Sequence, residues 1–300
     1  MEGLLENQIF EDFELSGMLA SFQGKPAFFC KKIPDETDPG WLYPYVVYDM
    51  NMREDPARNR SGTLLLHIYC SDESGCFDEE SILELKELES ALITVISGTI
   101  YTPETQKTSI CAVWNHSEAF ECEPALLAES DEYTAPVWGL KMSFDLMSFP
   151  VQMTADPDPV RAINEWTKSI FDSAGIIAYD TLPEVWKPTN NQPALYWRLN
   201  SIVASDDQSN TTIWFDCKIT GHVITGNVTD RTAWLKTLAE ELNVSGELPL
   251  TEDSNFVVKR VTIKPGADPF QKGQIIVKGR YGFLRKTPEQ GERLENLNFR

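Results

Sequence analysis

The chain carries an internal repeat, and this repeat constrains the fold more than any other feature. Pro34, Pro39 and Pro44 stand five residues apart, and Pro183, Pro188 and Pro193 repeat that spacing 149 positions later. In each copy an apolar run, a polar loop and a second apolar run follow: 45–48 and 63–68 in the first copy, 194–197 and 212–217 in the second. Three prolines in register with matching apolar runs predict a tandem duplication of a small domain.

A length of 300 residues agrees with two domains of ordinary size, each able to bury its own core. Asp156-Pro157-Asp158-Pro159 is the best linker, because it offers helix-capping carboxylates and prolines suited to a first helical turn. We therefore expect a first domain over 1–153, a second copy over 154–285 and a polar C-terminal tail over 286–300.

The apolar spacing predicts the same elements in both copies. Each copy is expected to begin with a helix, over 3–22 with a break near Gly17 and again from Val160 to Phe171. A long hairpin follows, of strands 44–50 with 63–70 and 193–203 with 211–219. The next helices, 79–95 and 229–243, precede the closing strands, which are 109–114, 118–122 and 137–146 in the first copy and 256–263 and 274–284 in the second. The closing strands match with Leu140 on Val277.

These elements predict an α+β fold of two similar domains, each an antiparallel or mixed β-sheet with a long hairpin packed by two helices. Residues Val46, Tyr48 and Met50 should share one face of the first hairpin, and Tyr45 and Val47 the other. Trp138, Trp166, Trp186, Trp197, Trp214 and Trp234 are expected to pack in the core rather than to form a stacking platform.

The charge balance disfavours nucleic-acid recognition. The chain has 26 basic and 46 acidic residues, a formal net charge of −20, whereas phosphate binding needs Lys/Arg patches. The excess of acidic residues has two interpretations, a solubilising surface or a surface along which polyanions pass without binding. No signal peptide and no membrane-length apolar run is visible, and the six cysteines do not follow the duplication, so we expect reduced thiols in a cytosolic setting.

No pattern of catalytic chemistry emerges from the sequence. The three histidines, His67, His116 and His222, lie far apart without metal-ligand spacing, and the offset of 149 equates His67 with Asp216 in a shared solvent-facing position. Nucleophile-elbow, Walker and dinucleotide motifs are absent, and Cys70 and Cys76 have acidic neighbours. We expect no enzymatic activity, no catalytic residue, no cofactor and no metal, while an enzyme with an active site outside these motifs stays an alternative.

The hairpin loops are the candidate interaction sites. Arg53, Arg58 and Arg60 concentrate basic charge in the first loop of an acidic protein, and Asp206 and Asp207 lie in the second loop. Arginine is enriched at protein interfaces, so these loops can dock onto another acidic subunit. A purely solvated loop is the alternative.

The run Tyr43-Pro44-Tyr45-Val46-Val47-Tyr48, the polar loop, the strand Thr63 to Cys70 and the amphipathic helix after it resemble tailed-phage tail terminator (tail-completion) proteins. The resemblance covers most of residues 1–150 and, through the repeat, extends to 155–285. It implies a structural virion or prophage protein that forms a ring on the end of the tail tube. Such a ring stops tube polymerisation and joins the head-side connector.

The family is usually a single domain and its ring usually a hexamer, so a fused pair implies three chains that supply six domains. The resemblance further implies assembly in the bacterial host cytoplasm, location in the virion tail, partners among tail-tube and head–tail connector proteins, no specific nucleic-acid binding and no membrane contact. A different phage neck or tail adaptor, or a monomeric intracellular binding module without enzymatic activity, are the competing interpretations.

Overall fold

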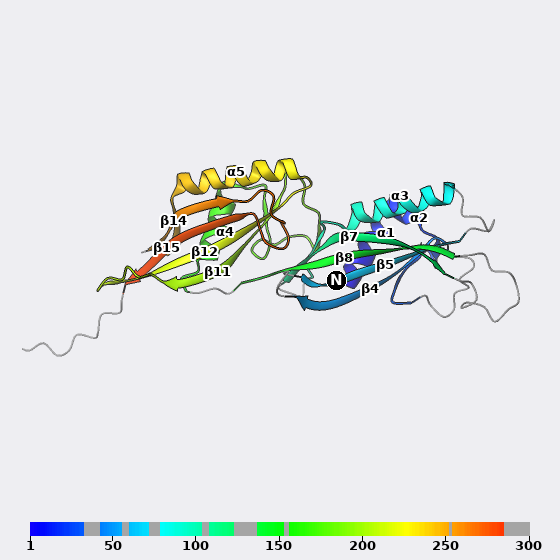
Figure 1. Cartoon of the computed structure of the whole chain (residues 1–300), viewed down its shortest axis with the longest axis horizontal. Coiled ribbons are helices and arrows are strands. Elements are labelled where there is room, and N and C mark those ends of the chain that lie inside the picture. The colour runs from blue at the N-terminus through cyan, green and yellow to red at the C-terminus, as the bar shows by residue number, and fades with distance from the viewer. Residues whose placement is uncertain are drawn as a thin grey trace, which may run out of the picture.

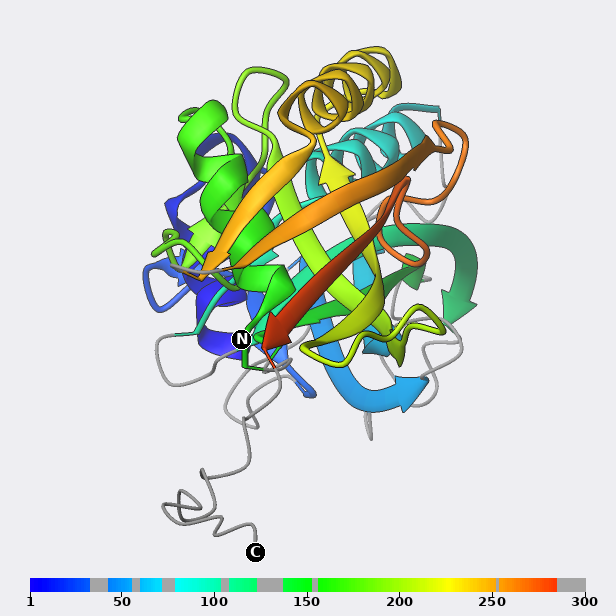
Figure 2. The same ribbon diagram turned by 90° about the vertical axis from the view of Figure 1, so that its left-hand side faces the viewer.

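The computed structural model describes residues 1–32, 43–55, 60–71, 79–103, 108–122, 137–152, 156–251 and 254–284. Within these residues, two large β-sheets follow one another along the long axis of the molecule, and helices cover the same side of both (Figure 1). Seen from the end of the molecule, the long helices of the two halves lie on one side, one behind the other (Figure 2).

The first half contains three helices and eight strands among the described residues. The helices are α1 (Glu2–Glu11), α2 (Phe13–Met18) and α3 (Glu79–Ile96). The strands are β1 (Ser21–Phe22), β2 (Lys25–Pro26), β3 (Phe28–Cys30), β4 (Tyr45–Asp55), β5 (Arg60–Ser71), β6 (Ile100–Tyr101), β7 (Thr108–Cys122) and β8 (Val137–Pro150).

The second half repeats the plan. Its helices are α4 (Pro159–Ile170) and α5 (Val228–Ser245). Its strands are β9 (Gly175–Ile176), β10 (Val185–Trp186), β11 (Ala194–Ala204), β12 (Thr212–Ile224), β13 (Glu247–Thr251), β14 (Ser254–Ile263) and β15 (Ile275–Leu284).

The two sheets have the same strand order. The first runs β6-β7-β8-β5-β4-β3 and the second β13-β14-β15-β12-β11-β9, while β10 of the second half is added to the β6 edge of the first sheet. Both sheets are mixed, because β3 pairs with β4 and β9 with β11 in parallel while the other pairs are antiparallel. The α+β class with two similar units is therefore confirmed.

The helices seal one core on each sheet. Val46 and Tyr48 of β4 lie in the first core with α1 and α3, and Leu195 and Trp197 of β11 lie in the second core with α4 and α5. Tyr45 packs on the opposite face of the first sheet, as the alternation predicted. Helix α4 begins where expected, since the Asp158 carboxylate accepts hydrogen bonds from the backbone N–H groups of Val160 and Arg161.

Three local predictions differ from the structure. The N-terminal helix already breaks at Asp12, whose side chain accepts from Leu15 N–H and starts a new helix. That second helix, α2, ends at Met18, beside the break expected near Gly17, and Ser21–Phe22 form β1 instead of continuing the predicted helix. Helix α5, predicted over 229–243, spans Val228–Ser245 and is capped by Asn227, which accepts from Asp230 N–H. The segments 109–114 and 118–122 are one strand, β7, with a bulge between Trp114 and His116.

The gapless repeat does not extend across the hairpin. Val46 pairs with Ile68 and Leu195 with Val223, so β5 matches β12 at an offset of 155 rather than 149. His67 is therefore equivalent to His222, not to Asp216. Leu64 pairs with Phe144 and Ile219 with Val277, which places Phe144, not Leu140, on Val277. Extra residues in the second hairpin account for the difference, and sequence spacing alone cannot locate them.

Residues of the second half complete the first sheet. Val185 pairs with Tyr101 and Trp186 with Ile100, so β10 extends the β6 edge. The predicted boundary near residue 154 lies outside the described residues, as does the predicted tail 286–300.

A shared core joins the two halves. Ile100, Cys111, Met147 and Phe149 of the first half pack against residues of the second half, which include Ile177, Ala194, Tyr196 and Ile224. The Phe149 and Tyr196 rings meet edge to face with centroids 5.1 Å apart, and the Tyr196 hydroxyl donates to the Pro150 carbonyl at 2.9 Å. We call this contact the internal interface. Its packed core and shared sheet edge make the chain one two-unit body.

Candidate functional site

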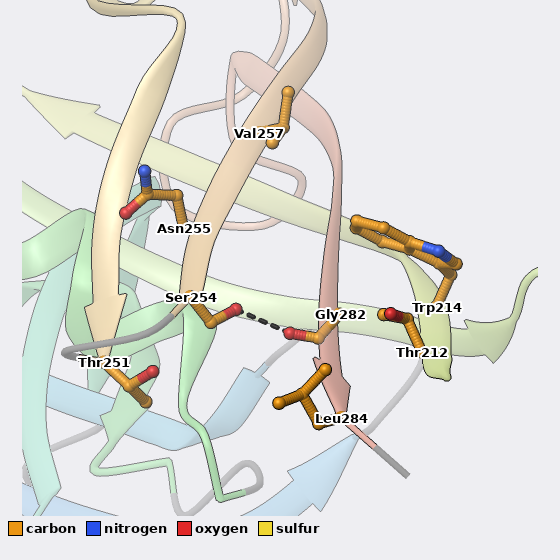
Figure 3. A pocket seen from close by; sticks show the side chains of 8 residues that line it. All are labelled: Thr212, Trp214, Thr251, Ser254, Asn255, Val257, Gly282 and Leu284. Carbon is orange, nitrogen blue, oxygen red and sulfur yellow. Dashed lines mark hydrogen bonds between the residues drawn. The ribbon is translucent and has the colours of Figure 1, made fainter. Parts of the chain in front are cut away.

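An open pocket of about 450 Å³ lies at the end of the second sheet, among strands β12, β13, β14 and β15. Figure 3 shows its lining, which is Thr212, Trp214, Thr251, Ser254, Asn255, Val257, Gly282 and Leu284. We call it the end pocket. In Figure 1 these strand ends lie at the end of the molecule farthest from the first half.

The pocket opens on the face of the sheet that no helix covers. Phe256 of β14 and Tyr281 of β15 point into the second core. Because side chains alternate along a strand, Val257 and Gly282 lie on the opposite face. The Ser254 hydroxyl donates to the Gly282 carbonyl at 2.6 Å and ties β14 to β15 at the pocket wall (Figure 3).

A glycine makes room for the Trp214 ring at the pocket wall. A Cβ atom at Gly282 would lie 2.7 Å from the indole ring of Trp214, so the ring rests directly over the glycine backbone. Any larger residue would displace the Trp214 ring. Trp214 was expected in the core, as Trp166 and Trp197 are, but it lies on the outer face and is partly exposed.

Arg280 is the charged centre beside the pocket. Its guanidinium donates to Asp216 Oδ1 at 3.1 Å, to Ser205 Oγ at 2.7 Å and to Asp207 Oδ2 at 3.2 Å. Its Cζ lies 6.0 Å from the centre of the Trp214 ring, within the range of a cation–π contact. The hydrogen bond from Arg280 lowers the pKa of the Asp216 carboxyl, which keeps that carboxyl ionised.

The structure brings together only part of the predicted loop set. Asp207 joins the Arg280 network, while exposed Asp206 accepts a backbone hydrogen bond from Gln208. Arg53 is exposed on β4 of the other hairpin. Arg58 lies outside the described residues, and Arg60 is placed in β5 without a described side chain. The docking role of these five residues stays a prediction.

The sequence prediction missed Arg280, Asp216 and Trp214. A signal for them existed, because in the second hairpin and the last strand these polar or amphipathic residues alternate with the core residues Phe215, Cys217 and Tyr281. The predicted repeat offset was wrong by six residues, so Asp216 was equated with His67 of β5, whose position it does not share. This error concealed the alternation.

The first sheet carries a second candidate surface on its helix-free face, formed by Phe29, Tyr43, Tyr45, Val47 and Tyr69. We call it the aromatic face. The Tyr45 and Tyr69 rings stack with centroids 4.7 Å apart, and Tyr43 lies 5.3 Å from Tyr45. Tyr45 is buried within this cluster, whereas the other four side chains are partly exposed.

In the part of the chain that the structure describes, no group of three His, Cys, Asp or Glu side chains is placed to hold a metal ion. Burial raises the pKa of the Cys70 thiol to about 11 and that of Cys217 to about 12, which keeps both thiols protonated at neutral pH. The predictions of no enzymatic activity and no cofactor stay predictions.

His222 is a buried structural histidine. Its Nδ1 lies 2.7 Å from the Pro269 carbonyl oxygen, and its ring packs 6.0 Å from that of Phe149 and 5.6 Å from that of Tyr196. Burial lowers the pKa of this imidazole to about 4, so it is neutral at pH 7. The equivalent residue in the first half, His67, is only half-buried.

The comparisons with known proteins add no family. No family model matches the chain, and no curated protein matches it. Of the helices among the described residues, none is long and apolar enough to span a membrane. The partly exposed Trp214 and Arg280 lie beside an open pocket, and the other half carries a tyrosine-rich face. Tryptophan, arginine and tyrosine are the residue types that dominate protein–protein contacts.

Proposed function

We propose that this protein is a structural component of a phage or prophage virion, similar to tail terminators. It forms a ring at the end of the tail tube, stops tube polymerisation and joins the head-side connector. The observation that carries the proposal is the internal interface, which fixes two copies of one α+β unit as a rigid segment. A contact that relates one unit to the next by a rotation generates a closed ring when that rotation closes.

Part of the resemblance to tail terminators is the Tyr43 to Tyr48 run. It enters β4 at Tyr45, and its residues Tyr43, Tyr45 and Val47 belong to the aromatic face. Three chains would supply six units with pseudo-six-fold symmetry. The partners are further copies of the chain, the tail tube and the head–tail connector. The protein is assembled in the host cytoplasm and resides in the virion tail, and it needs no cofactor.

The net charge of −20 supports a ring through which DNA passes. A lumen lined by carboxylates repels the phosphate backbone and so keeps the DNA from sticking. The protein has no specific nucleic-acid affinity in this proposal, and it is not an enzyme.

The test measures assembly and tube length together. Purified protein is analysed by light scattering on a sizing column, and a mass near three chains of 34.0 kDa is expected. It is then added to polymerising tail-tube protein from the same genome, and electron microscopy should show shortened tubes with a ring at one end. Tubes of unchanged length with no bound ring would refute the proposal.

The end pocket favours one alternative, a monomeric binding module that takes a side chain or small molecule beside Trp214 and Arg280. A protein that stays monomeric both alone and with tail tubes would support it. Another neck or tail adaptor of the same fold would instead form a ring and bind a different neighbour.

A further inference from the structure

The repeat gives residues on both sides of the internal interface core a counterpart in the other half, while the counterpart of β10 lies outside the described residues. Ala194 pairs with Ile224 in the second half, and the same ladder position in the first half pairs Tyr45 with Tyr69. Tyr196 corresponds likewise to Val47. The surface that the second half offers to the first is thus repeated, in the first half, as the aromatic face.

The opposite side of the internal interface is repeated as well. Tyr101 pairs with Ile110 and Leu248 with Phe256, and all four side chains are buried in their cores. One residue along, Ile100 pairs with Cys111 and Glu247 with Val257.

The next strand continues this correspondence. Cys111 pairs with Met147 and Val257 with Arg280, so two residues farther along β8 and β15 Phe149 corresponds to Gly282. The surface that the first half offers to the second is therefore repeated, in the second half, as the end pocket and Arg280.

We propose that the end pocket receives the aromatic face of a second copy of this chain, in a head-to-tail contact that repeats the internal interface. The inference rests on the proposed ring-forming function, because both require that the chain self-associates. The two surfaces lie at opposite ends of the molecule, so each chain can use each surface once (Figure 1).

The side-chain sizes fit this contact. In the internal interface the bulky Phe149 of the first half meets the second half, where Ala194 is small. At the chain ends the corresponding residues are Gly282 and Tyr45, so the smaller residue lies at the pocket and the larger one on the aromatic face. The end pocket of about 450 Å³ is open, and Tyr43, Val47 and Tyr69 are partly exposed around the buried Tyr45.

The polarity of the two contacts also differs in the expected direction. The internal interface lies within one chain, and its core consists of Ile, Met, Phe, Cys and Ala side chains together with Tyr196. The free surfaces must stay soluble before assembly, and they carry tyrosine hydroxyls on one side and Arg280, Asn255 and Ser254 on the other. Interfaces between separately folding chains favour Tyr, Trp and Arg over aliphatic residues in this way.

The test introduces one charge into each surface of the full-length chain. Val257→Glu blocks the end pocket and Val47→Glu blocks the aromatic face, while Val244→Glu on α5, where the valine is 81% exposed, is the matched control. Thermal melts check folding, and Asn255→Arg and Tyr69→Lys serve where a valine variant does not fold. Sedimentation should show self-association weakened at least about tenfold by either blocking variant and unchanged by the control.

Mixing the two blocked variants determines the direction of the contact. Each retains one intact surface, so a head-to-tail contact predicts that the mixture forms a complex of two chains and stops there. Either variant that self-associates like wild type overturns the inference, and so does a mixture that stays monomeric. These outcomes leave the tube-shortening assay to judge the proposed function separately, since a ring could use other surfaces.

Discussion

Substitution of His222 tests the internal interface through its pH dependence. The imidazole is 1% exposed and packs against both Phe149 and Tyr196, and burial lowers its pKa from 6.5 to about 4. Arg198 adds to this lowering, whereas the Pro269 carbonyl and Asp268 oppose it. The folded state therefore prefers the neutral ring, and this preference stabilises the protein above pH 6.5.

The stabilisation is lost as pH falls from 6.5 toward 4, because the unfolded chain binds a proton that the folded chain does not. With these pKa values the loss amounts to about 2 kcal/mol at pH 5 and to about 3 kcal/mol below pH 4. At a urea dependence of about 2 kcal/mol per molar, the midpoint of unfolding should fall by about 1 M between pH 7.5 and pH 5 through this residue alone.

The assay compares urea unfolding of wild type and His222→Asn at the two pH values. Asparagine retains an N–H donor for the Pro269 carbonyl but does not titrate. Carboxylates elsewhere titrate equally in both proteins, so only the difference between the two midpoint shifts counts. Parallel shifts would refute the reasoning, and so would an NMR titration of His222 with a pKa near 6.5.

Three further predictions concern the second half. Gln274 is fully buried and exchanges two side-chain hydrogen bonds of 3.0 Å with the Val223 backbone. Gln274→Leu should therefore lower the free energy of unfolding in urea by about 2–4 kcal/mol. The exposed control Gln192→Leu should leave it unchanged. A Cβ at Gly221 would overlap Trp197 and Ile275, so Gly221→Ala should cost about 1–3 kcal/mol; an effect equal to that of Gly266→Ala, where nothing lies within 4 Å, would contradict this. Since burial raises its thiol pKa to about 12, Cys217 should react with a disulfide reagent only on unfolding, and mass spectrometry that finds it labelled in the native protein would disprove this.

The periodicity of apolar residues was sufficient to predict the long helices and the long strands of the fold, but not the strands β1, β2, β6, β10 and β13. Leu85, Leu88 and Leu92 predicted α3, and the alternation in β4 predicted which of its side chains enter the core. These signals are local, since they depend only on neighbouring residues along one helix or strand. The duplication was inferred from the proline spacing: Pro44 and Pro193 each directly precede the equivalent strands β4 and β11, whereas Pro34 and Pro39 lie outside the described residues.

The site depended on register, which sequence spacing did not determine. The added residues in the second hairpin moved β12 by six positions against the predicted frame, so Trp214, Asp216 and Arg280 were not recognised as one cluster. The contribution of β10 to the first sheet was also missed. A two-residue strand has no periodicity, and its pairing with β6 is a non-local contact that no local pattern encodes.

The pairing of β10 with β6 also determines when the first sheet is completed during synthesis on the ribosome. Its pairing joins Tyr101 to Val185, so the β6 edge stays open until Val185, 84 residues after Tyr101, has been translated. At usual rates of elongation this interval lasts about 4–17 s. An open edge invites pairing with other nascent chains, but the edge strand β6 is only two residues long and so offers a poor template. Because β6 is so short, the nascent chain is protected from pairing with other chains until β10 has been translated.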